Sequence, residues 1–179
     1  MNHFAELVAN RRSVRQYADK PLLPSEVELI MKAALMSPSS KNSRSWQFVL
    51  VEDKEMLQNL SASKSVGSAF VAHCALAVAV LTDPLASEAY VEDAAIAATY
   101  IQLQAEELGL GSCWVQIRGR ERADGYDSEQ FVRDLLEIPS NLAVECLIAI
   151  GHKAKAEKPH SEESLQWEKL HIGTMHYMQ

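Results

Sequence analysis

Cysteine is scarce in this sequence, and no hydrophobic run is long enough to cross a membrane. The three cysteines, Cys74, Cys113 and Cys146, are odd in number, far apart and each set in an apolar run. We therefore expect reduced core thiols rather than a disulfide framework. The longest apolar run, residues 69–81, contains His73 and is shorter than a membrane span, and the N-terminus has no apolar stretch of signal length. These absences predict a cytoplasmic protein without a membrane anchor.

Positively charged residues are also fewer than negatively charged ones. The chain has 17 Lys plus Arg against 24 Asp plus Glu, a formal net charge of -7. This is the wrong sign for binding a phosphate backbone along a broad face, so nucleic acid is not an expected partner. With 47% hydrophobic and 23% charged residues, the 179-residue chain has ordinary globular composition and no linker-like stretch. We predict one domain over residues 1–179.

Several catalytic motifs are missing. There is no GxxxxGK phosphate loop, no GxSxG elbow and no HExxH, and the six histidines are scattered. Nucleotide hydrolysis, serine hydrolysis and zinc proteolysis therefore lose their usual support, and no metal site is predicted. Gly109-Leu110-Gly111 has a GxG spacing, but it follows a predicted helix and enters a predicted strand, the reverse of a dinucleotide-binding unit. Taken alone, it is most simply a helix C-cap with tight packing.

Apolar periodicity predicts alternating helices and strands. A short helix around Phe4–Val8 ends near Arg11-Arg12-Ser13, and the capping-box spacing of residues 25–28 begins a second helix that runs to about residue 37. Further helices are expected at 54–60, 90–108 and 128–137, and strands at 46–51, 75–82, 112–117 and 144–150. Residues 118–127 form a charged excursion. The tail, residues 151–179, has too few apolar residues for a core of its own, so a partner subunit is its simplest support.

Two polar segments are candidates for ligand binding. Arg11, Arg12 and Arg15 lie within five residues around Ser13, so guanidinium groups and a hydroxyl could converge on a phosphate; the alternative is a solvated basic turn. Residues 37–46 place many small polar groups between a helix and a strand, where they could contact the edge of a planar heteroaromatic ligand. The alternative is simply a polar loop.

The two segments together resemble the nitroreductase family. Its members open with an Arg-Arg/His-Ser-x-Arg/Lys element and follow it with an Ala/Ser-Pro-Ser-x-x-Asn-x-x-x-Trp loop, and order and spacing match here. The resemblance continues through Asp93 and the alanine-rich helix to Leu108-Gly109-Leu110-Gly111-Ser112-Cys113-Trp114. It recurs at Ile148-Ala149-Ile150-Gly151, followed by a basic tail. It therefore covers nearly the whole chain.

The resemblance implies an α+β nitroreductase-like fold with a central mixed, mainly antiparallel sheet flanked by helices. It also implies an entwined homodimer that binds one FMN per subunit at the dimer interface, with the tail, residues 151–179, extending over the partner subunit. One subunit would hold the FMN phosphate and ribityl chain through Arg11, Arg12, Ser13 and Arg15. The other subunit would supply Pro38, Ser39, Ser40 and Asn42.

Further roles follow from the same resemblance. Arg15 resembles the basic residue that reaches the N1 and O2 edge of the flavin, and Gly111 with Ser112 resembles the main-chain stretch near the ring. Lys158 and His160 stand where the family usually offers Lys or Arg to the phosphate. His160 departs from this pattern, because a neutral imidazole binds phosphate more weakly than Arg. Arg44-Ser45 and His152 replace the common Gln-Pro and Tyr.

The implied activity is transfer of hydride from NAD(P)H through flavin N5 to small oxidised acceptors such as nitroaromatics, quinones or enones. The isoalloxazine carries the chemistry, so no nucleophile is needed. Arg15 would stabilise the negative charge that arises near N1 and is the predicted catalytic residue. Three alternatives stay open: another flavin-dependent reaction on the same fold, an FMN-binding module without turnover, and an interaction protein without cofactor.

Overall fold

The computed structural model describes residues 3–175. The helices are α1 (His3–Asn10), α2 (Pro24–Leu35), α3 (Lys54–Leu60), α4 (Tyr90–Glu107) and α5 (Ser128–Leu135). The strands are β1 (Trp46–Val51), β2 (Leu76–Thr82), β3 (Leu110–Gln116) and β4 (Ala143–His152). Short 3-10 turns lie at η1 (Ser40–Asn42), η2 (Ala69–His73), η3 (Glu162–Ser164) and η4 (Trp167–Lys169).

The sheet has the strand order β1-β2-β4-β3, and each neighbouring pair is antiparallel. A parallel bridge between Ser13 and Ser112 adds the mixed component, since it places the chain after α1 beside the start of β3. The predicted α+β fold with a mainly antiparallel sheet flanked by helices is thus confirmed.

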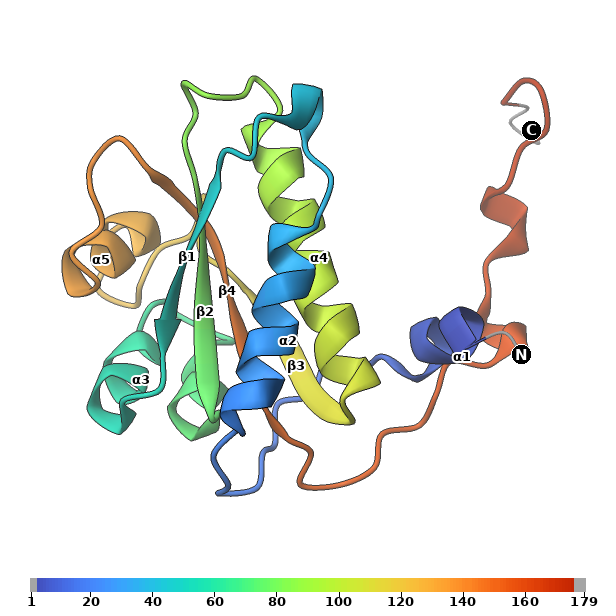
Figure 1. The fold of residues 1–179 in the computed structure, drawn as a ribbon, viewed down its shortest axis with the longest axis horizontal. Helices are drawn as coiled ribbons and strands as arrows, with labels where there is room; N and C mark the ends of the chain where they lie inside the picture. The colour runs from blue at the N-terminus through green and yellow to red at the C-terminus, as the bar shows by residue number, and fades with distance from the viewer. Residues whose placement is uncertain (1–2, 176–179) are drawn as a thin grey trace.

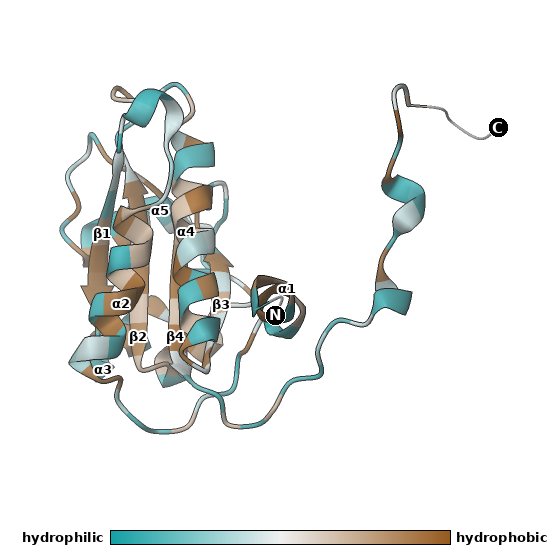
Figure 2. Cartoon of the chain, turned by 45° about the vertical axis from the view of Figure 1, so that its right-hand side comes forward, coloured by the Kyte–Doolittle hydropathy of each residue, from teal (hydrophilic) through white to brown (hydrophobic). Residues whose placement is uncertain are grey.

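Helices cover both faces of the sheet. Figure 1 shows α2 and α4 side by side on one face, while α3 and α5 lie toward the other. Every residue of β2 is buried, as expected of a central strand covered on both sides. The strand residues are brown in Figure 2, which marks them as the apolar centre of the molecule. On α4, Ala94, Ala98 and Ala105 are fully buried against the sheet, because their small side chains allow a close approach.

The structure shifts several predicted boundaries. The second helix begins at Pro24, and Leu23 rather than Ser25 is its N-cap, with the Leu23 N–H donating to the Glu26 carboxylate at 2.7 Å. Proline at the first helical position starts the helix there, because its fixed φ suits a helix and its missing N–H is not needed. β3 begins at Leu110, two residues before the predicted start.

The predicted start of the tail at Gly151 is wrong, because β4 continues to His152. Gly151 pairs with Gly111 and His152 with Leu110, so both residues belong to the sheet. Beyond them the chain passes α1 and leaves the body of the molecule, as Figure 1 shows. The large apolar side chains on this part of the tail are exposed: Leu165, Trp167, Leu170, Ile172 and Met175.

The composition-based expectations for the core are met. Cys74, Cys113 and Cys146 are all buried and free, as predicted. Within residues 3–175, no helix has the length and hydropathy that crossing a bilayer requires.

Candidate functional site

The arginine segment, residues 11–15, lies against the start of β3. Ser13 forms the parallel bridge with Ser112, and the Val14 N–H donates to the Ser112 carbonyl at 2.9 Å. Val14 is only 1% exposed and rests on Gly111, where an added Cβ would lie 2.7 Å from the Val14 Cβ. Gly111 is therefore required for the close approach of two backbones, and the GxG pattern does more than end a helix.

Cys113 is the point on which the cationic groups converge. Burial raises the pKa of its thiol. Four groups oppose this shift: the Arg15 and Arg11 guanidiniums, the Ser13 hydroxyl and the Lys64 ammonium. The positive charges of Arg11, Arg15 and Lys64 thus all favour the ionised form of one thiol of β3. The structure thus places the segment that carries Arg11, Ser13 and Arg15 beside Ser112.

Lys64 also acts on Cys113, and no pattern in the sequence pointed to it. Burial lowers the pKa of its ammonium group, and the nearby charge of Arg120 lowers it further. The loop after α3 that carries Lys64 is tied to the 118–127 excursion, since the Ser65 N–H donates to the Glu121 carbonyl at 3.0 Å. No local pattern marks this lysine, so only the tertiary contact identifies it.

The tail brings His160 to the same end of the molecule. The His160 N–H donates to the Ala9 carbonyl of α1 at 2.9 Å, and Arg12 Nη1 lies 3.1 Å from His160 Nδ1. Arginine is only a donor, so Nδ1 of His160 is the acceptor in this contact. Lys158 is exposed on the segment that leads to His160. His160 therefore lies against Arg12 and α1 of its own chain.

The donor set is suited to a dianionic phosphate. Among residues 3–175, the ion pairs between side chains involve other cations, and Arg11, Arg12, Arg15, Lys64 and Lys158 have no carboxylate partner. Three of these cations, Arg11, Arg12 and Arg15, lie within five residues of one another, so their charges are available together to a bound anion. Guanidinium groups, a hydroxyl and main-chain N–H groups are the usual phosphate ligands, so the residues present fit the FMN phosphate.

The serine loop, residues 37–46, is held by a buried carboxylate. Asp93 in the first turn of α4 is 2% exposed and accepts from the Ser40 N–H at 2.7 Å. It also accepts from the hydroxyls of Ser43 at 3.2 Å and Ser87 at 2.8 Å. In the sequence, Asp93 stands out only as part of the family resemblance; in the structure, it anchors this loop.

The same loop has an unusual backbone. Lys41, Asn42 and Arg44 have φ values of 51°, 55° and 49°, a region that non-glycine residues seldom adopt. The Ser39 hydroxyl accepts from the Arg44 N–H at 2.9 Å, and the Asn42 side-chain oxygen accepts from Arg44 Nε at 3.1 Å. Pro38 is exposed at the start of the loop. Loops with a strained backbone that many hydrogen bonds hold in place are concentrated at functional sites.

The two predicted halves of the site do not meet within one chain. The serine loop enters β1 at Trp46, which pairs with Thr82 at the end of β2. Ser112 pairs with Ile150, which in turn pairs with Leu76 at the opposite end of β2. The seven residues of β2 separate these ends by about 20 Å at about 3.3 Å per residue. Figure 1 shows the same separation, with the loop beyond the upper end of the sheet and the chain after α1 beside its lower end.

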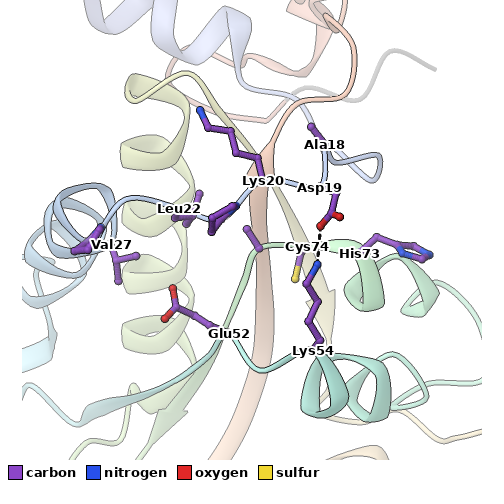
Figure 3. Close-up of a pocket in the computed structure, with 12 residues that line it drawn as sticks. Ala18, Asp19, Lys20, Leu22, Val27, Glu52, Lys54, His73 and Cys74 are labelled. Carbon is purple, nitrogen blue, oxygen red and sulfur yellow. Dashed lines mark hydrogen bonds and ion pairs between the residues drawn. The ribbon is translucent and has the colours of Figure 1, made fainter.

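A cavity of about 630 Å³ lies beside the arginine segment but contains none of the predicted site residues. Figure 3 shows Leu22 and Val27 on one side of it and Lys54 and Asp19 on the other. The Lys54 ammonium donates to the Asp19 carboxylate at 2.6 Å, so the two charges in this wall compensate each other. The cavity therefore lacks the excess of positive charge that distinguishes the arginine segment.

Comparison with known proteins gives consistent matches. The family model described as "Nitroreductase family" matches residues 8–65 and 58–152. A protein of Archaeoglobus fulgidus, provisionally named NADH dehydrogenase/NAD(P)H nitroreductase, is 32% identical over 166 residues, which cover 90% of this chain and 91% of that protein. The FMN reductase [NAD(P)H] of Bacillus subtilis is 28% identical over 182 residues, 89% of this chain and 70% of that protein.

A solved structure extends this similarity to three dimensions. The FMN-dependent nitroreductase of Clostridium difficile is 40% identical and covers 94% of this chain and 98% of its own, with a TM-score of 0.92. The likeness thus extends over nearly the whole chain.

Proposed function

Because this chain belongs to the nitroreductase family, we propose that it passes electrons from NAD(P)H through FMN to small oxidised acceptors such as nitroaromatics, quinones or enones. The family prediction is confirmed, and with it the predictions of an NAD(P)H-dependent oxidoreductase and of FMN as its cofactor. The acceptors, the dimer, the cytoplasmic location and the residue roles given below are proposals.

The observation that carries the proposal is the group of cations without carboxylate partners over the start of β3. The FMN phosphate and ribityl chain would be held by Arg11, Arg12, Ser13, Lys158 and His160. Contact between Arg12 and His160 supports this assignment, because it aligns two of these side chains before any ligand is present. An anion is then bound by charges that need little further ordering.

Around the ring, the proposed groups are Arg15 and the main chain of Gly111 and Ser112. When bound, FMN supplies the redox chemistry, taking two electrons from NAD(P)H at N5 and passing them on. Arg15 would stabilise the negative charge near N1, and its guanidinium stays protonated at every working pH. Packing of Arg15 over the Phe70 ring, 5.8 Å from the ring centroid, favours a fixed orientation for this guanidinium.

A second copy of the chain would complete the site. The arginine segment and the serine loop lie at opposite ends of the sheet, so Pro38, Ser39, Ser40 and Asn42 would reach the ring from the partner subunit. Support for a partner also comes from the tail, where Trp167 is 64% and Ile172 is 98% exposed. Apolar side chains in such number need a surface to cover them, and we assign this role to the partner subunit.

The visible spectrum of the purified protein, together with the ratio of FMN to chain, tests cofactor binding. We expect a yellow protein with one FMN per chain that bleaches when mixed anaerobically with NADH or NADPH. A yellow protein that does not bleach would indicate a carrier, and a colourless protein that takes up no FMN would contradict the whole proposal. Assays with nitrofurazone, a quinone and an iodotyrosine then distinguish a general reductase from a dehalogenating enzyme.

Substitution of Arg12 tests the phosphate assignment. Loss of a charge-assisted hydrogen bond predicts roughly tenfold or greater weakening of FMN binding in Arg12→Ala. Lys32→Ala is the matched control, because it removes one exposed charge from the outer side of α2. Equal FMN affinities for the two variants would contradict the assignment. Sedimentation of the yellow protein tests the dimer, and single chains that retain FMN would exclude the shared site.

A further inference from the structure

Tyr17 crosslinks the arginine segment to the sheet through its hydroxyl. The phenol oxygen lies 2.7 Å from the Val14 carbonyl and 3.2 Å from the Ala149 carbonyl of β4. A phenol has one hydrogen to donate, and the shorter distance shows that most of it goes to Val14. The Val14 carbonyl belongs to the peptide group that joins Val14 to Arg15. The hydroxyl therefore holds the plane of the peptide from which the Arg15 side chain starts.

Two glycines that face each other make room for this arrangement. Gly111 of β3 and Gly151 of β4 are register partners, so both Cβ positions point to the same face of the sheet. Val14 rests on Gly111, and the Tyr17 ring rests on Gly151, where an added Cβ would lie 2.9 Å from the ring carbon Cδ1. Because neither glycine has a side chain, Val14 and the Tyr17 ring can pack directly on the backbone of β3 and β4.

The main chain on either side of Tyr17 is also fixed. The Ala18 N–H donates to the His152 carbonyl at 2.9 Å, and the Ala154 N–H donates to the Gln16 carbonyl at 3.1 Å. Burial raises the pKa of the Tyr17 phenol well above its ordinary value, and the neighbouring thiols of Cys74 and Cys113 add to the shift. The phenol therefore stays protonated and remains a hydrogen-bond donor at any physiological pH.

We infer that Tyr17 is a positioning residue, whose hydroxyl orients the Val14–Arg15 peptide and thereby directs the Arg15 guanidinium toward the flavin edge. This inference rests on the proposed function, since it assumes that Arg15 faces N1 of FMN. Arg15 is exposed, and its long side chain carries the guanidinium over the Phe70 ring, 5.8 Å from the ring centroid. A small rotation of the intervening peptide therefore moves the guanidinium at the end of a long side chain.

The midpoint potential of bound FMN reports this orientation, because a positive charge near N1 favours the reduced, more negative flavin. Tyr17→Phe keeps the ring over Gly151 and removes only the hydroxyl. We expect the preference of the site for reduced over oxidised FMN to fall about tenfold. For a two-electron couple, this lowers the midpoint potential by about 30 mV. Tyr126→Phe is the matched control, because it removes a surface hydroxyl that donates to Asp134 at 2.8 Å, away from the arginine segment.

A double-mutant cycle shows whether Tyr17 acts through Arg15. If it does, Tyr17→Phe lowers the potential in the native background but has no further effect in the Arg15→Ala background. Additive effects of the two substitutions would overturn the inference. A loss of folding stability alone would leave the potential unchanged, so this measurement separates a positioning role from a purely structural one.

A second variant keeps the hydroxyl but displaces it. Gly151→Ala pushes the Tyr17 ring away from β4, and we expect the same fall in potential together with faster exchange of the Ala18 amide, which donates to the His152 carbonyl, in the apoprotein. Unchanged potentials in both Gly151→Ala and Tyr17→Phe would overturn the inference while leaving FMN binding and the proposed function intact. Failure of the unsubstituted protein to bind FMN would instead contradict the proposed function, and the role of Tyr17 with it.

Discussion

Replacing Gly111 by alanine places a methyl group where the structure has no room for one. An ideal Cβ at this position lies 2.7 Å from both Cβ and Cγ1 of Val14 and 3.0 Å from Cγ2. Neither side can yield easily, because Val14 is 1% exposed and its N–H is bonded to the Ser112 carbonyl. Gly111 itself is held in β3 by its pairing with Gly151. The arginine segment must therefore move away from the strand.

The expected loss of folding stability in Gly111→Ala follows from the cost of overpacking a core. Inserting a methyl group without space costs about 1–3 kcal/mol. For a domain of this size, each kcal/mol lowers the melting temperature by about 2–4 °C, so we expect Gly111→Ala to melt about 4–8 °C lower for a cost near 2 kcal/mol. Displacement of the guanidiniums should also weaken FMN binding by about tenfold, which corresponds to about 1.4 kcal/mol.

Melting curves at fixed protein concentration and fluorescence titrations with FMN measure the two effects separately. Gly125→Ala is the control, because Gly125 has a φ of 79° but no atom within 4 Å of an added Cβ. It should lose about 1 kcal/mol through backbone strain and keep its FMN affinity. Val14→Gly in the Gly111→Ala background removes all three Val14 atoms that the added methyl group meets, so it should restore part of the affinity. Unchanged stability and FMN binding in Gly111→Ala would refute the reasoning.

Other predictions concern the buried carboxylate and the buried ionisable groups. Asp93→Ala leaves the Ser40 N–H and two serine hydroxyls without an acceptor, so about 3 kcal/mol of stability should be lost and residues 37–46 should become sensitive to protease. Glu92→Ala, on the exposed side of the same helical turn, should show neither effect. Burial raises the pKa of Cys74 from 9.0 to about 12, so its stabilising contribution is present at neutral pH and is lost as the pH rises above about 9. The urea midpoint should therefore be lower at pH 10 than at pH 8, and equal midpoints would contradict this assignment. A thiol reagent at pH 8 should modify none of the three buried cysteines until the protein is unfolded.

Local patterns in the sequence determined the helices and strands and pointed to both candidate segments. Apolar runs of the right length predicted β1 and β2, and the alanine-rich stretch predicted α4, because burial demands these patterns wherever the elements finally lie. The arginine cluster and the serine-rich loop were recognisable as polar groups at unusual density. Boundaries were less accurate: Leu23 replaced Ser25 as N-cap because proline follows it, and β4 extended to His152 because its partner strand continues there.

How these pieces combine depends on contacts between distant parts of the chain. The strand order β1-β2-β4-β3 places the arginine segment and the serine loop at opposite ends of the sheet, and no periodicity along the chain carries that information. Neither Lys64 nor the pairing of the two glycines beneath Val14 and Tyr17 could be predicted from local patterns, since each depends on contacts between residues far apart in the chain. The sequence shows which side chains are apolar or charged, and hence which segments are buried. The folded chain determines which of the charged side chains act on the same strand.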